Sequence, residues 1–187
     1  MSEPAEDDEP ERVEALVDRA REGDEAALGA LLREMVPTLR RRLQRLLGPR
    51  PSLDDATQDV LVAIARGVEG FRGESRFETW CHRICIRVAR RHMHRERPRP
   101  VLALVPDADA VDPEARAIAR QRLERLYAAL DELEPDARVA FVLCAIEGHD
   151  PSEAAALCDV SAGTMRVRLH RARKRVEERL DADGRLR

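Results

Sequence analysis

Residues 150–180 read DPSEAAALCDVSAGTMRVRLHRARKRVEERL, and this stretch predicts two helices joined by a turn of three residues. Asp150 and Glu153 have the spacing of a capping box, so the first helix should begin sharply. The helical period is interrupted at residues 159–161, where Ser161 offers a second N-cap. The stretch therefore predicts a helix–turn–helix unit.

The second helix of this unit has an apolar face and a basic face. Apolar residues recur at steps of three and four and form an inward stripe of Met165, Leu169, Ala172, Val176 and Leu180. At about 100° per residue, the opposite face holds Gly163, Arg166, Val167, His170, Arg171 and Lys174. Such a helix suits the DNA major groove, where arginine reaches guanine edges and neighbouring cations hold phosphates. An ordinary solvated helix could carry the same charges, but the capped first helix, the short turn and the basic face together favour DNA binding.

Basic residues are concentrated in two segments of an otherwise acidic chain. The 187 residues have a net charge of −3, yet residues 71–100 carry nine basic against three acidic side chains, and residues 161–187 carry nine against four. This segregation indicates two nucleic-acid contacts, with other surfaces that avoid nucleic acid or meet basic proteins. It disfavours a protein that coats DNA uniformly.

The composition predicts an all-α fold of two small helical domains joined by a flexible linker. Aromatic residues are only 3% of the chain and charged residues are 37%. We expect a disordered acidic leader at residues 1–11, a first domain at 12–96, a proline-punctuated linker at 97–112 and a second domain of four helices at 113–187.

Two helix starts in the first domain carry capping signals. Asp24 precedes an apolar stripe that runs through residues 28–47, in which Pro37 predicts a kink or a brief break. Ser52 has an aspartate three residues later, which resembles another capping box and opens a helix over residues 53–66.

The segment at residues 71–97 combines aromatic and arginine side chains. Aromatic rings interleaved with arginines suit the unstacked bases of a single strand, with stacking worth about 1–3 kcal/mol per base. For Phe77 and Trp80 the alternative, that the rings fill a small core, stays open. Phe71 and Arg76 form the pair that we expect to be exposed.

Three motifs in a fixed order resemble a known family. The chain resembles bacterial RNA polymerase sigma factors of the extracytoplasmic-function (ECF) class, in the sigma-seventy family. Its similar motifs are FRGESRFETWCHRI, ALDELEPDARVAFVLCAIEG and GTMRVRLHRARKR. The resemblance covers roughly residues 12–180. It implies that the first domain is sigma region two and that the second is sigma region four. The family often has glycine in the turn where this chain has Asp159, but aspartate tolerates the left-handed conformation, so the turn should survive.

The resemblance also implies roles for particular residues. Docking on the polymerase clamp falls to Asp55, Gln58 and Asp59. Capture and opening of the promoter's minus-ten element falls to Phe71, Arg72, Arg76, Phe77, Trp80, Arg83, Arg87, Arg90 and Arg91. Reading of the minus-thirty-five element falls to Thr164, Arg166, Val167, His170, Arg171 and Lys174. The linker matches the segment threaded toward the polymerase active-site channel.

The implied partners are core RNA polymerase (clamp and flap), promoter DNA and an anti-sigma factor. We expect a cytoplasmic protein without membrane insertion, cofactor, metal or small-molecule substrate. Enzyme activity is disfavoured because we find no glycine-rich phosphate loop, Ser/His/Asp arrangement or metal motif. Cys81 and Cys85, next to His82, could ligate zinc or sense oxidation, but their positions are apolar in the family, which favours buried small side chains.

The main alternative is a stand-alone helix–turn–helix regulator that binds duplex DNA by itself. Such a regulator needs neither a polymerase-docking helix nor a melting loop, so the first domain argues against it. A protein-interaction scaffold without DNA would leave both basic segments unexplained.

Overall fold

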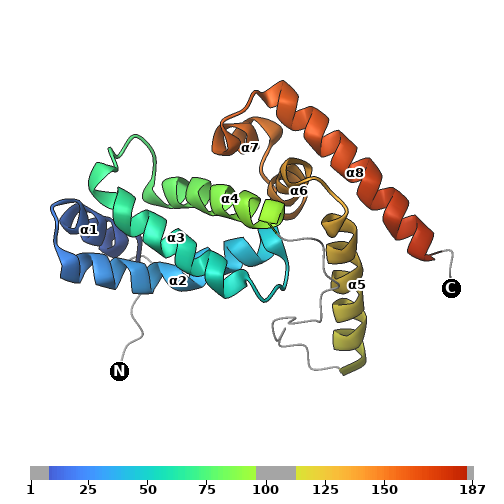
Figure 1. The fold of residues 1–187 in the computed structure, drawn as a ribbon, viewed down its shortest axis with the longest axis horizontal. Helices are drawn as coiled ribbons and strands as arrows, with labels where there is room; N and C mark the ends of the chain where they lie inside the picture. The colour runs from blue at the N-terminus through green and yellow to red at the C-terminus, as the bar shows by residue number, and fades with distance from the viewer. Residues whose placement is uncertain (1–8, 96–112, 185–187) are drawn as a thin grey trace.

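Two groups of helices pack against each other in the computed structural model, which describes residues 9–95 and 113–184 (Figure 1). The first group contains α1 (Glu9–Arg21), α2 (Glu25–Leu47), α3 (Leu53–Gly67), the short 3₁₀-helix η2 (Val68–Gly70) and α4 (Phe77–Arg95). The second contains α5 (Pro113–Asp131), α6 (Pro135–Phe141), the π-helical segment η3 (Val142–Ile146), α7 (Pro151–Cys158) and α8 (Ala162–Gly184). The prediction of an all-α fold with two helical domains is confirmed.

Two predicted segments lie largely outside the described ranges. The linker at residues 97–112 is one of them, and residues 1–8 of the acidic leader are the other. Helix α1 begins at Glu9, which is inside the segment predicted to be a disordered leader. The prediction placed the start of helical structure too late.

Helix α2 is the centre of the first domain, because α1, α3 and α4 all pack against it. Its N-terminus is capped as predicted, with the Asp24 carboxylate accepting a hydrogen bond of 2.9 Å from the Ala27 N–H. The helix is assigned continuously through Pro37, so the predicted brief break is absent. Burial of Met35 and Leu39 on either side holds the helix in the core although proline removes one backbone donor.

The capping box predicted at Ser52 does not form. Helix α3 starts at Leu53, but the Ser52 side chain makes no capping hydrogen bond. The backbone of Ser52 has ψ near 0°, whereas an N-cap residue ordinarily has the extended conformation that directs its side chain toward the first turn. The Ser52 hydroxyl is instead buried without a hydrogen-bond partner among the described residues.

The helix–turn–helix unit forms as the sequence predicts. Asp150 and Glu153 make both hydrogen bonds of a capping box. Asp159 adopts the left-handed conformation at φ 55° and ends α7, and Ser161 accepts a hydrogen bond of 3.1 Å from the Thr164 N–H at the start of α8. The inward stripe of α8 is buried from Met165 to Val176. Leu180 was also predicted to face inward, but it is 36% exposed because the covered part of the stripe ends before it.

The two domains share a polar contact at the C-terminal end of α2. Arg138 of α6 is 1% exposed and donates hydrogen bonds of 2.6 Å to the carbonyl oxygens of Leu46 and Leu47. Carbonyls in the last turn of a helix lack intrahelical partners, so the second domain supplies them here. Asp131 forms ion pairs with both Arg138 and Arg50. Burial lowers the pKa of Arg138, and the Asp131 carboxylate opposes that shift.

Tyr127 of α5 covers the residue that ends α2. Its hydroxyl donates to the Gln44 carbonyl over 3.2 Å. Gly48 has φ +80°, and a Cβ atom at this position would lie 2.8 Å from a ring carbon of Tyr127. The close approach of the two domains therefore requires glycine here for both its conformation and its size.

Candidate functional site

The outer face of α8 gathers the residues predicted to read the minus-thirty-five element. All six are exposed, and Val167 has half of its surface open. Thr164 also belongs to the N-terminal cap, since its hydroxyl shares a hydrogen bond of 2.9 Å with that of Ser161. Arg168 lies off this face and pairs with Asp136 of α6. The helical-wheel arithmetic thus placed Arg166 and Arg171 on an open face and left out Arg168, which pairs within the domain.

The arginines predicted for the minus-ten element fall into two sets. Exposed side chains that could meet DNA phosphates belong to Arg72, Arg76, Arg83 and Arg87. Arg90, by contrast, is 23% exposed and forms an ion pair of 2.9 Å with Asp136 of the second domain. Arg91 is about half exposed and pairs with Asp59 of α3 over 2.8 Å. In this arrangement Arg90 faces protein, so only part of the predicted set is open to DNA.

The three aromatic rings of this segment form one cluster. Ring centroids of Phe71, Phe77 and Trp80 lie 5.4–5.5 Å apart. Phe71 is 8% exposed and Phe77 is 5% exposed, whereas Trp80 is half-buried. The expectation that Phe71 is exposed is therefore wrong, because the ring turns from the loop into the core. Of the three, Trp80 keeps the most open ring surface for an unstacked base.

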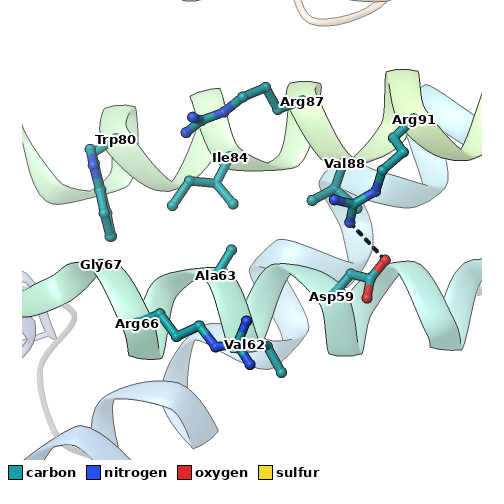
Figure 2. A pocket seen from close by; sticks show the side chains of 10 residues that line it. All are labelled: Asp59, Val62, Ala63, Arg66, Gly67, Trp80, Ile84, Arg87, Val88 and Arg91. Atoms are coloured by element: carbon teal, nitrogen blue, oxygen red, sulfur yellow. Dashed lines mark hydrogen bonds and ion pairs between the residues drawn. The ribbon is translucent and has the colours of Figure 1, made fainter.

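A groove of about 580 Å³ separates α3 from α4 (Figure 2). Trp80 lies at one end of it, opposite Gly67, where an added Cβ atom would come within 3.0 Å of the indole ring. Arg87 lies between, and Arg91 closes the other end with Asp59. The groove thus brings residues predicted for minus-ten recognition against a residue predicted for polymerase docking.

The predicted docking residues of α3 differ in their surroundings. Asp55 and Gln58 are exposed. Asp59 has 41% of its side chain exposed and contacts α4, with its carboxylate 2.9 Å from His92 Nε2 and 2.8 Å from an Arg91 nitrogen. The hydrogen bond from His92 and the charge of Arg91 lower the pKa of Asp59 against a smaller opposing effect of burial. Asp59 therefore ties α3 to α4 as well as facing outward.

Cys81 and Cys85 are buried in the first domain, with 1% and 0% of their surface exposed. The prediction that they are small buried side chains is confirmed. Burial raises the pKa of both thiols, that of Cys85 to about 12. The reactive thiolate form is accordingly disfavoured at both positions. Within the ranges that the structure describes, no helix combines the length and the apolar character needed to cross a membrane.

Family models match both domains of the chain. The family model described as Sigma-70 region 2 matches residues 31–99, and that described as Sigma-70, region 4 matches residues 123–176. Together they match more than half of the chain, and they occur in the order that the sequence motifs predict.

Curated relatives and solved structures agree with these matches. An ECF RNA polymerase sigma-E factor of Haemophilus influenzae is 28% identical over 89% of this chain and 94% of its own length. The ECF RNA polymerase sigma factor SigE of Mycolicibacterium smegmatis is 35% identical over 84% of this chain and 64% of its own. CnrH, solved in complex with the cytosolic domain of CnrY, has a TM-score of 0.63 and 26% identity, with 92% of this chain and 99% of that chain covered. The chain therefore belongs to the sigma-70 family of RNA polymerase sigma factors, in its ECF class.

Proposed function

We propose that this sigma factor directs promoter-specific initiation by core RNA polymerase through three separate surfaces of the described chain. The outer face of α8 reads the minus-thirty-five element, the loop before α4 together with α4 acts at the minus-ten element, and the exposed face of α3 docks on the polymerase. The observation that carries this proposal is the α8 face, where six residues named from the sequence are all exposed behind a capped turn.

The chemistry of the α8 face supports direct base reading. Arg166 and Arg171 have planar guanidinium groups that can donate two hydrogen bonds to one guanine edge. Val167 and His170 between them add an apolar contact and a further donor, and Lys174 is a point charge suited to phosphate. Base contacts thus fall to the first turns of the helix, and phosphate contacts to the turn that follows.

The first domain supports strand opening better than recognition of closed duplex. Arg72 and Arg76 lie in or beside the loop, and both are exposed. Trp80 is only half-buried, and its open ring surface could stack with an unstacked base but not with a paired one. Energy gained only after melting favours the open promoter over the closed one. Because Phe71 and Phe77 pack in the core, this role falls mainly to Trp80 and the arginines.

Partners of the solved relatives indicate how the factor is regulated. CnrH was solved with the cytosolic domain of CnrY, and RpoE of Bartonella quintana was solved with the anti-sigma factor NepR, at 25% identity and a TM-score of 0.56. We extend this to the present chain, which we expect to be held inactive in the cytoplasm by an anti-sigma factor.

Transcription in vitro with core polymerase tests the proposed function. We expect promoter-specific transcripts that depend on the added factor. The double variant Arg72→Ala, Arg76→Ala should lose activity on a duplex promoter and recover it on a template whose minus-ten region is already mismatched. The control changes Arg33 and Arg41, two exposed arginines of α2, and should transcribe both templates normally. An equal deficit of the loop variant on both templates would remove the melting role.

A further inference from the structure

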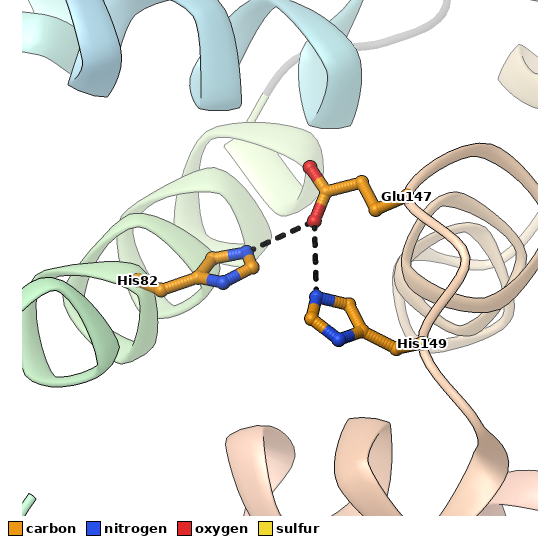
Figure 3. A group of neighbouring side chains, drawn as sticks. All are labelled: His82, Glu147 and His149. Carbon is orange, nitrogen blue, oxygen red and sulfur yellow. Dashed lines mark ion pairs between the residues drawn. The ribbon is translucent and has the colours of Figure 1, made fainter. Parts of the chain in front are cut away.

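Three side chains from the two domains converge at a point that promoter recognition does not use. His82 comes from α4, and Glu147 and His149 come from the segment between η3 and α7 (Figure 3). One carboxylate oxygen, Oε2 of Glu147, lies 3.3 Å from His82 Nε2 and 3.6 Å from His149 Nε2. One potential ligand atom from each of the three residues lies within 4.8 Å of the others.

We propose that His82, Glu147 and His149 bind a divalent transition-metal ion of the zinc class, which bridges the two domains. Two imidazole nitrogens and one carboxylate oxygen are a ligand set that zinc accepts, with a fourth position left for water. Ligand atoms spaced as these are can surround one ion at ordinary zinc distances of about 2.0–2.2 Å after small side-chain adjustments.

The buried atoms of this cluster support a ligand rather than a simple ion pair. The side chains of His82 and Glu147 are 5% and 7% exposed. Among the described residues, His82 Nε2 and Glu147 Oε1 are buried without a hydrogen bond of good geometry, and the contact of Nε2 with Oε2 is an ion pair at 3.3 Å. Buried polar atoms are almost always satisfied, so this nitrogen aimed at the cluster calls for an explanation. A bound cation would satisfy it.

A second carboxylate lies beside the other ring nitrogen of His149, where it could accept a hydrogen bond after a small adjustment. Its Nδ1 lies 3.7 Å from Oε2 of Glu153, and that oxygen is fixed by a hydrogen bond of 3.0 Å from the Asp150 N–H. Metal-bound imidazoles commonly direct their other nitrogen to a carboxylate in this way. The capping box of α7 thus also holds one side of the proposed site.

The arginines near Glu147 do not occupy the carboxylate oxygen that faces the two histidines. Arg45 approaches the other oxygen, Oε1, at 3.7 Å. Arg42 and Glu78 line the same cavity of about 270 Å³, so their opposite charges offset each other beside the site. The Oε2 side remains directed at the two imidazoles.

The proposed ion would stabilise the closed arrangement of the domains. It can use all three ligands only while α4 and the segment before α7 are together. The minus-ten and minus-thirty-five elements are about 25 base pairs apart by position, or about 85 Å at 3.4 Å per pair. Domains in direct contact cannot span that distance, so promoter binding requires separation. This step rests on the proposed function, whereas the metal site itself does not.

The test is a zinc titration of the full chain, with calorimetry and a competing chelator. We expect one equivalent to bind, His149→Ala and Glu147→Gln to abolish that binding, and Glu153→Gln to weaken it by about 10–100-fold. His94→Ala, an exposed histidine of α4 remote from the cluster, should bind like wild type. Helical content measured without metal confirms that each variant folds, and the partly exposed His149 is the change least disruptive to packing.

Two further readouts separate this site from others. The cobalt complex should lack a sulfur-to-metal charge-transfer band, because no cysteine is a ligand in the proposal. Zinc should reduce the radius of gyration of wild type in solution scattering and leave that of His149→Ala unchanged. The proposal would be overturned by the absence of stoichiometric binding, by a sulfur-to-metal band, or by wild-type zinc affinity in His149→Ala. Zinc binding by a protein that fails to support transcription would instead reject the proposed function alone.

Discussion

At the scale of single residues, the recognition helix separates base-reading side chains from phosphate-binding ones. Arg166→Ala in the holoenzyme should cost about 1–3 kcal/mol of discrimination at one position of the minus-thirty-five element, because a bidentate guanine contact is lost. Lys174→Ala should weaken binding to every sequence by a similar factor. Binding to a panel of single-base promoter variants measures the difference. Uniform losses for both changes would mean that the helix only holds phosphates.

Asp59 and Asp55 offer a matched pair for separating stability from docking. The folded pKa of Asp59 is below its ordinary value of 3.8, so its stabilising effect is present above that value and is lost as the pH falls through the folded pKa. Asp59→Asn should lower the free energy of unfolding by about 1 kcal/mol or less at neutral pH, because the carboxylate is partly solvated. Urea unfolding between neutral and acidic pH should show this difference shrinking.

Asp55→Asn provides the control, since Asp55 is exposed. It should lower the free energy of unfolding by about 0.3–1 kcal/mol, because a carboxylate is lost from the first turn of α3, and it should reduce affinity for core polymerase. A stability difference for Asp59→Asn that stays constant down to strongly acidic pH would contradict the assigned ion pair.

The sequence correctly predicted which side chains of α8 are exposed, but not which side chains are exposed in the loop before α4. On α8 a regular helical period fixes every side-chain direction, so Arg166 and Met165 could be assigned to opposite faces. The loop has no period, and Phe71 therefore gave no sign that it turns inward onto Phe77. Arg90 and Arg87 looked equivalent in the sequence, and only the position of Asp136 in the other domain distinguishes them.

At the scale of helices, two serines with the same predicted role make a direct comparison of caps. Ser161 accepts from the Thr164 N–H, whereas Ser52 makes no capping bond. Ser161→Ala should cost about 0.5–2 kcal/mol of unfolding free energy. Ser52→Ala should be close to neutral or slightly stabilising, because it removes a buried hydroxyl without a partner in the described chain. Chemical unfolding of both variants tests this, and equal losses would show that Ser52 does cap α3.

At the scale of the whole molecule, the contact between the domains could not be predicted from the sequence. Arg138 and Asp131 look like ordinary exposed positions of amphipathic helices. Their partners Leu46, Leu47 and Arg50 lie some eighty to ninety residues away in the chain. No periodic pattern encodes such a pairing, because the end of one helix meets the side of another that belongs to a different domain.

Arg138 decides how firmly the domains are held together. Its guanidinium satisfies two carbonyls of α2 and pairs with Asp131, all in a buried setting. Arg138→Met keeps the length of the side chain but removes these donors, and breaking a buried pair costs about 3–5 kcal/mol. Asp131 keeps its ion pair with Arg50 in the closed form, but the two carbonyls lose their donor and can regain water only if the domains separate, so the variant should favour opening. Solution scattering should show larger dimensions at unchanged helical content.

The same substitution at Arg175 serves as the control. Arg175 is exposed on α8 and lines the cavity beside this interface, but its ion pairs are with Glu132 and Glu178 of its own domain, so Arg175→Met removes a charge and no ion pair between the domains. It should keep the dimensions of wild type.

The opened Arg138→Met protein should still bind core polymerase, because the docking face of α3 is unaltered. It should bind at least as tightly as wild type, because polymerase binding no longer has to provide the free energy that separates the domains. Wild-type dimensions in Arg138→Met would mean that the other contacts between the domains, among them those of α4 with α6 and α7, hold the closed arrangement without it.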